Sequence, residues 1–113
     1  MTIKWVKVDP LVMNGEPFCY GTRLTVRQLL ELRSNGYGLA ELLKDHPELR
    51  TVGIAAAYAY AAQNRARYAD FFEADGSIAG PGYTEDQAAG LPPHYRIPGV
   101  VVKPGRETAV ASG

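Results

Sequence analysis

The stretch from residue 51 to residue 74 constrains the fold of this chain more than any other part of the sequence. It is rich in alanine, contains no proline, and ends at Asp75-Gly76. Alanine is the best helix former, and glycine after the last turn is a common helix end, so the sequence predicts one long helix over these residues. Its apolar run, Ile54 to Ala62, has no polar face, which is typical of a buried helix.

Two shorter helices are predicted before this one. The first begins near Thr25, because Thr25 and Gln28 have the spacing of a capping box, and it ends at residues 35–36, Asn-Gly. The second covers about residues 39–45 and is closed by Pro47. The order predicts a mainly α fold, a three-helix helix–turn–helix-like (homeodomain-like) domain.

Short β segments are predicted on both sides of the helices. Residues 3–8 have the pattern of a short strand near the N-terminus, and residues 97–102 are rich in valine and predict a second one near the C-terminus. Between the helices and that second strand, glycine and proline indicate a long loop. We therefore divide the chain into a domain over residues 1–75 and an extension over residues 76–113.

Composition excludes several classes of protein. Lys plus Arg and Asp plus Glu are 12 each, so a protein bound to nucleic acid mainly by bulk charge is not expected. Cys19 is the single cysteine and cannot form an internal disulfide. The longest apolar run is about half the ~18–20 residues that a membrane span needs. We expect a cytoplasmic protein without membrane contact.

The sequence carries no recognisable set of catalytic or metal-binding residues. Cys19, His46 and His94 are far apart, without the short spacings of a metal site. There is no Gly-x-Ser-x-Gly motif and no phosphate-binding glycine loop between a strand and a helix. We expect no enzymatic activity, no metal and no cofactor.

A helix–turn–helix unit that binds DNA places the start of its second helix in the major groove. Here that start offers few polar side chains, and the rest of the helix is apolar, so a buried or dimer-forming helix is at least as well supported. The best candidates for DNA contact are basic or polar residues near the turn or on the first helix: Arg27, Lys44, Arg50 and Thr51. The candidates for contact with a second copy or another partner are Val52, Ala55, Tyr58, Ala59 and Ala62.

Residues 15–26 read Gly-Glu-Pro-Phe-Cys-Tyr-Gly-Thr-Arg-Leu-Thr-Val. This run resembles the hallmark Gly-x-Pro-x-x-x-Gly-Thr-Arg-x-x-Val of the bacterial domain of unknown function 433 family. Asp45-His46-Pro47-Glu48-Leu49 agrees as well, and the resemblance extends over about residues 3–61. Its motif residues are Gly15, Pro17, Gly21, Thr22 and Arg23. Glycine allows a sharp bend, and a structural role for the arginine, bound to backbone carbonyls, is favoured over phosphate binding.

The resemblance implies a compact helix–turn–helix domain similar to antitoxins encoded beside a toxin with a PIN-like ribonuclease fold. The expected function is therefore binding and neutralising such a ribonuclease, with binding of operator DNA and repression of its own operon as an additional option. The alternative is a homo-oligomeric structural or adaptor module that binds neither toxin nor DNA. A homodimer is expected in both cases. The chain departs from the family pattern at Arg50, Val52, Gly53 and Ala55, where the family has a Ser/Thr cap, acidic residues and a polar residue, which argues against DNA reading.

The extension has the composition of a segment that wraps a partner. A basic side chain could enter the acidic metal site of a ribonuclease, and residues 100–102 could add a strand to a sheet edge of the toxin. The candidate toxin contacts are Arg96, Val101, Lys103 and Arg106. Pairing of the same strand with residues 3–8 inside a dimer is nearly as well supported, because an exposed valine-rich edge invites aggregation.

Overall fold

The structure of the protein is a computed structural model that describes residues 5–11, 15–19, 21–22 and 24–103. In this part the fold is mainly α, as predicted. The elements in chain order are β1 (Val6–Lys7), β2 (Phe18–Cys19), α1 (Val26–Ser34), α2 (Leu39–Asp45), α3 (Thr51–Gln63), the 3-10 turn η2 (Ala69–Phe71), α4 (Glu85–Ala88) and the 3-10 turn η3 (Pro93–Tyr95).

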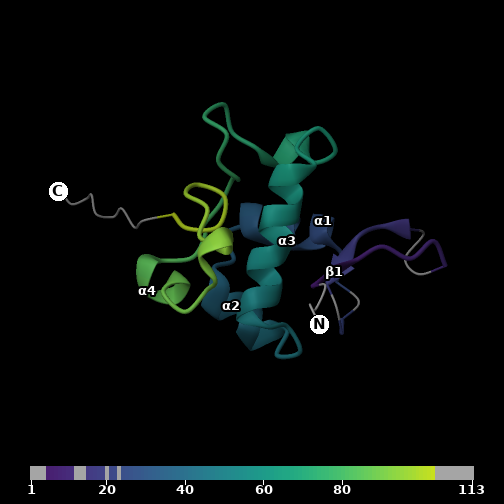
Figure 1. The fold of residues 1–113 in the computed structure, drawn as a ribbon, viewed down its shortest axis with the longest axis horizontal. Coiled ribbons are helices and arrows are strands. Elements are labelled where there is room, and N and C mark those ends of the chain that lie inside the picture. Colours follow the sequence, from purple (N-terminus) through teal and green to yellow (C-terminus); the bar gives the residue numbers. More distant parts are fainter. Residues whose placement is uncertain (1–4, 12–14, 20, 23, 104–113) are drawn as a thin grey trace.

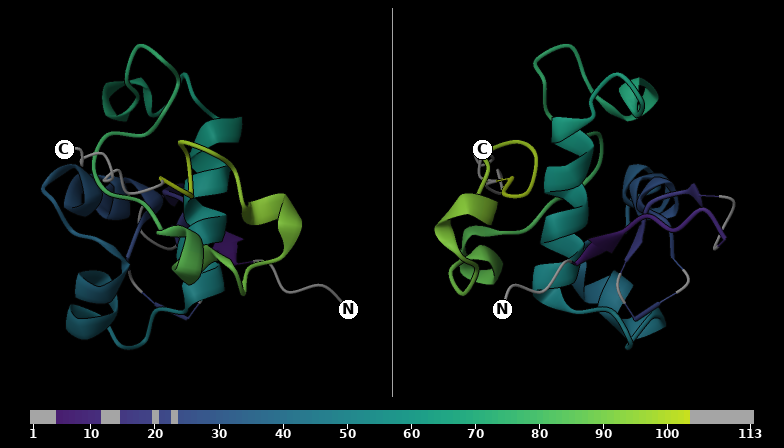
Figure 2. Two further views of the ribbon diagram at one scale, coloured as in Figure 1. Left: turned by 90° about the vertical axis from the view of Figure 1, so that its left-hand side faces the viewer. Right: turned by 45° about the vertical axis from the view of Figure 1, so that its right-hand side comes forward.

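Helix α3 lies at the centre of the molecule (Figure 1). Helices α1 and α2 cover one side, the β1–β2 hairpin lies on a second, and the segment that carries α4 lies on a third, as Figure 2 shows from two further directions. All residues from Gly53 to Ala59 are buried. The apolar run of the sequence is therefore the core helix of a single chain.

The first two helices form as their end signals predict. The Thr25 hydroxyl accepts a hydrogen bond from the Gln28 amide at 3.0 Å, and the Gln28 side chain accepts one from the Thr25 amide at 2.9 Å, which completes the capping box. Gly36 takes a φ of 100° just beyond the end of α1, a value that glycine adopts without strain. Helix α2 has the predicted bounds.

Helix α3 ends at Gln63, so the predicted helix over residues 51–74 is wrong beyond that point. The Asn64 side chain donates a hydrogen bond to the Tyr60 carbonyl at 2.9 Å and competes with the next helical turn. The chain then bends back, which buries Tyr68 completely and brings η2 against α1. Burial of an aromatic side chain outweighs the helix propensity of nearby alanines.

The segment 97–102 is a tight turn and not the predicted regular strand. Its residues form isolated bridges, Pro98 with Val102 and Tyr83 with Val102, and Gly99 has a φ of 78°. Proline followed by glycine in the left-handed region bends the chain where a strand would have to continue. The partner proposed for that strand, β1, pairs with β2 in antiparallel register.

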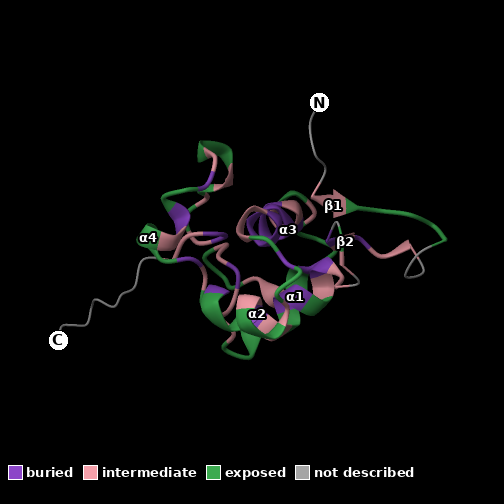
Figure 3. Cartoon of the chain, turned by 90° about the horizontal axis from the view of Figure 1, so that it is seen from below, coloured by how far each residue is buried: buried purple, intermediate pink, exposed green. Residues whose placement is uncertain are grey.

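The extension shares one hydrophobic core with the helices. Five of its large apolar side chains are buried in the same cluster as α1 and α3, and they are Ile78, Tyr83, Leu91, Val100 and Val101. The view along α3 in Figure 3 shows the helix enclosed by α1 and α2, by the hairpin and by the segment that carries α4. The described part of the extension is thus packed onto the domain and does not project from it.

Candidate functional site

The glycine-threonine part of the motif makes a tight loop between β2 and α1. Gly21 has a φ of 81°. The Thr22 hydroxyl donates to the Cys19 carbonyl and accepts from the Leu24 amide, both at 3.0 Å. The Cys19 amide in turn donates to the Leu24 carbonyl at 2.8 Å. The Thr22 hydroxyl therefore satisfies two backbone groups of the bend, and Gly21 supplies its left-handed conformation.

The first part of the motif fixes the start of α1. Pro17 is buried, and its carbonyl accepts a hydrogen bond from the Val26 amide at 2.9 Å. Gly15 has a φ of 79°, again in the left-handed region. Both residues therefore shape the backbone that leads into α1. Arg23 lies outside the described residues.

The four candidates for DNA contact lie at two ends of α3. Arg27 donates a hydrogen bond to the carbonyl of Arg67, just beyond the C-terminal end of α3, at 3.1 Å. Arg50 is the N-cap of α3 and is exposed, as is Lys44 on α2. A helix as long as α3 spans about 20 Å. Thr51 is half-buried, and its carbonyl accepts a hydrogen bond from the Tyr83 hydroxyl. The structure therefore does not bring the four together.

The predicted partner contacts on α3 are wrong for three of the five residues. Ala55, Tyr58 and Ala59 are buried inside their own chain, while Val52 and Ala62 are half-buried. The Tyr58 ring meets the ring of Tyr83 from the extension, edge to face, with centroids 6.2 Å apart. The extension thus covers the apolar surface from which a dimer was predicted.

The four predicted toxin contacts differ in their burial and in whether the structure describes them. Val101 is completely buried, so its predicted contact with a toxin is wrong in this fold. Lys103 is half-buried and Arg96 is exposed. Arg106 lies outside the described residues.

A buried arginine that the sequence interpretation did not assign to a site joins α1 to the extension. Arg33 has no exposed surface. Its guanidinium donates hydrogen bonds to the carbonyls of Val100, Ile78 and Gly99, the last two at 3.3 and 3.4 Å. The cation lies 4.5 Å from the centre of the Tyr58 ring. No ion pair links Arg33 to a carboxylate in the described part of the chain, so carbonyl dipoles and an aromatic face stabilise its charge.

Burial lowers the pKa of Arg33, and the neighbouring Tyr58 raises it.

The sequence contains a pattern that marks position 33. Arg33 follows Val26, Leu29 and Leu30 at helical spacing on the buried face of α1. A charged residue in an apolar stripe indicates either a long side chain that reaches solvent or a buried cation that binds backbone groups.

Two glycines let the extension pass close to Arg33. A Cβ atom at Gly80 would lie 2.0 Å from the Arg33 carbonyl oxygen, and Gly80 has a φ of +94°. A Cβ atom at Gly82 would lie 2.5 Å from the Val101 carbonyl oxygen. These glycines permit a close approach of two backbones, and their function is not to make a flexible loop.

The remaining arginines near α1 also make contacts within the chain. The Arg27 guanidinium lies 5.2 Å from the centre of the Tyr68 ring, and that of Arg65 lies 5.2 Å from the centre of the Phe72 ring. Arg67 forms an ion pair with Glu16 of the motif at 3.3 Å. The contacts of Arg27 and Arg67 join the segment after α3 to α1 and to the motif, and the contact of Arg65 lies within that segment.

The hairpin presents the exposed large apolar side chains of the described residues. Val8 is 56% exposed and Leu11 is 93% exposed, and both follow β1 in the connection to β2. In the described part of the chain β1 and β2 form a two-stranded antiparallel sheet. The described residues that follow β1 extend away from α3 (Figure 3).

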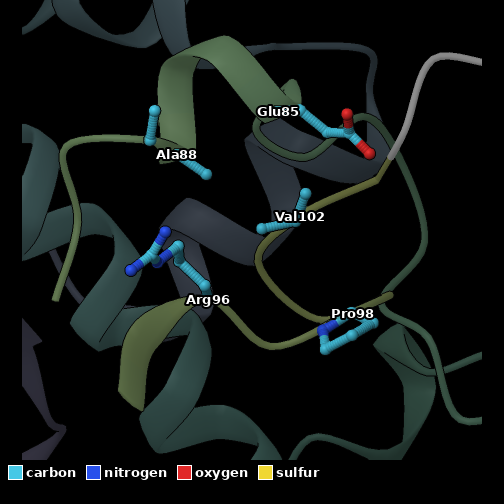
Figure 4. Close-up of a pocket in the computed structure, with 6 residues that line it drawn as sticks. Glu85, Ala88, Arg96, Pro98 and Val102 are labelled. Atoms are coloured by element: carbon cyan, nitrogen blue, oxygen red, sulfur yellow. The ribbon is translucent and has the colours of Figure 1, made fainter. Parts of the chain in front are cut away.

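A pocket of about 330 Å³ lies between α4 and the turn at 96–102. Its walls are mostly apolar and come from Glu85, Ala88, Ala89, Arg96, Pro98 and Val102. Figure 4 shows the Glu85 carboxylate and the Arg96 guanidinium on opposite sides, with Val102 between them. No helix among the described residues is long and apolar enough to cross a membrane.

Comparison with known proteins assigns the N-terminal half. A family model described as "Protein of unknown function (DUF433)" matches residues 6–61. Through these residues, the chain belongs to the DUF433 family. A crystal structure of a DUF433 member protein from Anabaena variabilis is similar at 29% identity and a TM-score of 0.55. The similarity covers 58% of this chain and 65% of that one, so the chain spans somewhat less than two thirds of it. The comparison with curated proteins found no match.

The DUF433 match contains the motif, α1, α2 and most of α3. Arg33 is inside it, whereas the carbonyls that its guanidinium binds are in the extension, beyond residue 61. The pocket also lies entirely in the extension. The family match therefore covers the motif and most of the core helix, and the extension lies outside it.

Proposed function

We propose that the protein is an antitoxin-like, protein-binding partner of a PIN-like ribonuclease, and that the β1–β2 hairpin makes the contact. The observation that carries the proposal is the exposure of Val8 and Leu11 in the connection that follows β1. Large apolar side chains that are exposed close to one another are typical of a surface that contacts another protein.

Operator binding has weaker support. A recognition helix needs an exposed face that fits the major groove, and α3 is buried from Gly53 to Ala59. Lys44 and Arg50 remain as exposed basic groups near the turn, while Arg27 makes its contact at the other end of α3. A formal net charge of zero adds no general attraction to phosphates.

The proposal places the contact with the ribonuclease on the hairpin and not on residues 100–102. A partner surface needs apolar side chains that the fold leaves accessible. Val101, however, is buried against the core, and Val8 is exposed. The two apolar side chains of the hairpin would give such a contact its hydrophobic centre.

The test uses the full chain and a PIN-like ribonuclease, which the proposal expects to be encoded beside it. We expect the chain to inhibit cleavage of RNA near equimolar ratio and to bind the ribonuclease in calorimetry. The double variant Val8→Asp/Leu11→Asp should weaken binding at least tenfold, because it places charge at an apolar contact. Both residues are exposed, so the variant should fold. Ala66→Asp, an exposed position beyond α3, is the matched control and should bind like the parent.

Absence of binding at micromolar concentration would contradict the proposal. Light scattering of the chain alone then tests the alternative, an oligomeric adaptor module. Self-association that the hairpin double variant abolishes would favour that module, because the hairpin would then contact a second copy. Equal binding of ribonuclease by parent and variant would keep the neutralising function and reject the hairpin as its surface.

A further inference from the structure

We propose that the pocket between α4 and the turn at 96–102 binds a peptide through one aliphatic side chain. The peptide carries an acidic group on one side of that side chain and a basic group on the other. The ligand is taken to be a peptide because of the proposed protein-binding function. The site itself lies in the extension, away from the hairpin, and its physical basis is independent of any ribonuclease.

Both walls of the pocket are fixed before a ligand arrives. In the turn, the Val101 amide donates to the Ile97 carbonyl and the Gly99 amide donates to the Val102 carbonyl, both at 2.8 Å. Arg33 binds this turn to α1 through the Val100 carbonyl. A preformed site does not lose loop entropy on binding, so even a small contact area can give measurable affinity.

The α4 wall is joined directly to the turn. The Lys103 amide donates to the Tyr83 carbonyl at 3.0 Å, next to the bridge between Tyr83 and Val102. Thr84 then begins α4 with a capping box to Gln87, at 3.1 and 2.9 Å. The two walls therefore keep a fixed separation.

The centre of the pocket suits an aliphatic group. Ala88, Pro98 and Val102 supply apolar walls, and the short alanine side chains leave the space open. A volume of about 330 Å³ is near the lower end of the ~300–1,000 Å³ range of ligand pockets. It admits a branched side chain with its flanking backbone and is too small to enclose a dinucleotide.

The charged groups of Glu85 and Arg96 determine which groups should flank the aliphatic side chain of the ligand. Glu85 and Arg96 are exposed, lie on opposite sides of the pocket, and form no ion pair with any described residue. Asp86 lies beside Glu85 in the first turn of α4 and adds negative charge at that side. A ligand with a cation near Glu85 and an anion near Arg96 matches both ends, whereas a polyanion such as RNA would be repelled at the Glu85 side.

The experiment is an amide NMR titration of the full chain with two peptide probes. They are blocked Asp-Gly-Leu-Gly-Lys and blocked Lys-Gly-Leu-Gly-Asp, and a peptide with serine in place of leucine is the control. We expect one leucine probe to shift the amide signals of Ala88, Ala89, Arg96 and Val102, and to bind at least fivefold more tightly than the other leucine probe. The serine peptide should bind at least fivefold more weakly than the better probe.

Variants decide whether the pocket is the site. Ala89→Trp fills the pocket from an exposed position and should weaken binding at least tenfold, whereas Ala66→Trp makes the same exchange outside the pocket and should bind like the parent. The double variant Glu85→Arg/Arg96→Glu should reverse the preference between the two leucine probes. Localised shifts together with that reversal would support the proposal.

Three results would overturn the peptide site: no shift at millimolar probe, shifts elsewhere on the chain, or equal binding by Ala89→Trp and Ala66→Trp. The hairpin double variant Val8→Asp/Leu11→Asp should bind the peptide unchanged. Failure of the ribonuclease test would leave these expectations in place, so the two proposals can fail separately.

Discussion

The DUF433 half and the extension of this chain are stabilised in different ways. In the DUF433 half, turns and caps close over a few residues, as in the bond from Thr22 to Cys19 across three positions. The extension is instead held by contacts between residues that are far apart in the sequence. The guanidinium of Arg33 on α1 donates to the carbonyls of Ile78, 45 positions away, and Val100, 67 positions away. Local sequence signals encode the first kind of contact. The long-range contacts of Arg33 let the glycine- and proline-rich extension become part of the core. The buried Arg33 guanidinium binds backbone carbonyls of the extension that have no partner in a strand or helix.

Because the extension is part of the core, the apolar surface of α3 is no longer evidence for a dimer. A helix without a polar face needs cover on all sides, and α1, α2 and the hairpin leave one side open in this fold (Figure 3). The extension covers that side with Tyr83 against Tyr58. Oligomerisation is thus not required to bury the helix.

Deletion of residues 77–113 should produce the largest effect and tests the contrast most directly. The deletion removes Ile78, Tyr83 and Val101 from the core and exposes Tyr58 on α3. We expect loss of the cooperative thermal transition in circular dichroism, or aggregation. A deletion of residues 104–113 alone leaves every contact described above in place and is the control. A truncated protein that melts like the parent would mean that the DUF433 half is a complete domain.

Arg33→Met should destabilise the protein by about 4 kcal/mol in urea unfolding, because the carbonyls of Val100 and Ile78 lose the donor that Arg33 supplies. Arg33→Lys keeps the charge with fewer donors in a fixed geometry, so we expect a loss of about 2 kcal/mol. The control is Arg65→Met, which removes an exposed arginine with a ring contact to Phe72 and should cost less than about 1 kcal/mol. A near-neutral Arg33→Met would show that the extension does not depend on the cation.

Gly80→Ala should cost about 3 kcal/mol, since the new Cβ would lie 2.0 Å from a backbone oxygen at a φ of +94°. Gly90→Ala is the matched control in the same segment. It has no neighbouring atom within 4 Å of the new Cβ, and it should be neutral or slightly stabilising. Equal unfolding midpoints for the two variants would contradict the close passage of the extension over Arg33.

The elements that the sequence predicts well are those with local signals. The capping box at Thr25, the Asn-Gly end of α1 and the proline after α2 each act within a few residues, so their consequences follow from the chain itself. The motif glycines are predicted for the same reason, since a bend requires them whatever the rest of the protein does. The buried character of the alanine-rich helix also follows directly, from the absence of a polar face.

The sequence does not disclose what covers that helix. The apolar pattern of Ala55, Tyr58 and Ala59 is the same whether the cover is a second copy or the chain's own extension, so the prediction of a dimer surface was wrong for these residues. The end of α3 was missed because burial of Tyr68 competes with helix propensity over a distance that no local pattern records. The pocket depends on two walls that meet only in the folded chain.

Alkaline pH should destabilise the core that the two regions share. Burial raises the pKa of the Cys19 thiol to about 12 from an ordinary value of 9.0, and raises the pKa of Tyr58 to about 12 from 10.0. Both groups are neutral in the folded state and ionise earlier in the unfolded state. Their stabilisation is therefore complete below about pH 9 and declines as the pH rises toward 12.

Urea unfolding midpoints measured between about pH 8 and pH 11 would test this pH dependence. Cys19→Val keeps an apolar side chain of similar size and removes the thiol, so its decline with pH should be shallower than that of the parent. Tyr58→Phe removes the phenol beside the extension and should reduce the decline in the same way. Parallel curves for parent and Cys19→Val would mean that the thiol ionises freely in the folded protein.

The smallest effects are expected from substitutions in a capping motif that occurs in both regions. Thr25 and Thr84 both begin a helix with the box Thr-x-x-Gln, and their hydroxyls accept from the third amide at 3.0 and 3.1 Å. Thr25→Ala should cost about 1 kcal/mol, because α1 packs against α3 and its loss of order spreads to the core. Thr84→Ala should cost about 0.5 kcal/mol in global stability, because it caps a helix of four residues at the surface. Its effect should instead be on the pocket, with at least a twofold weaker binding of the peptide probe, since the α4 wall loses its fixed position. A larger global loss for Thr84→Ala than for Thr25→Ala would reverse the comparison and make the extension the more cooperative of the two regions.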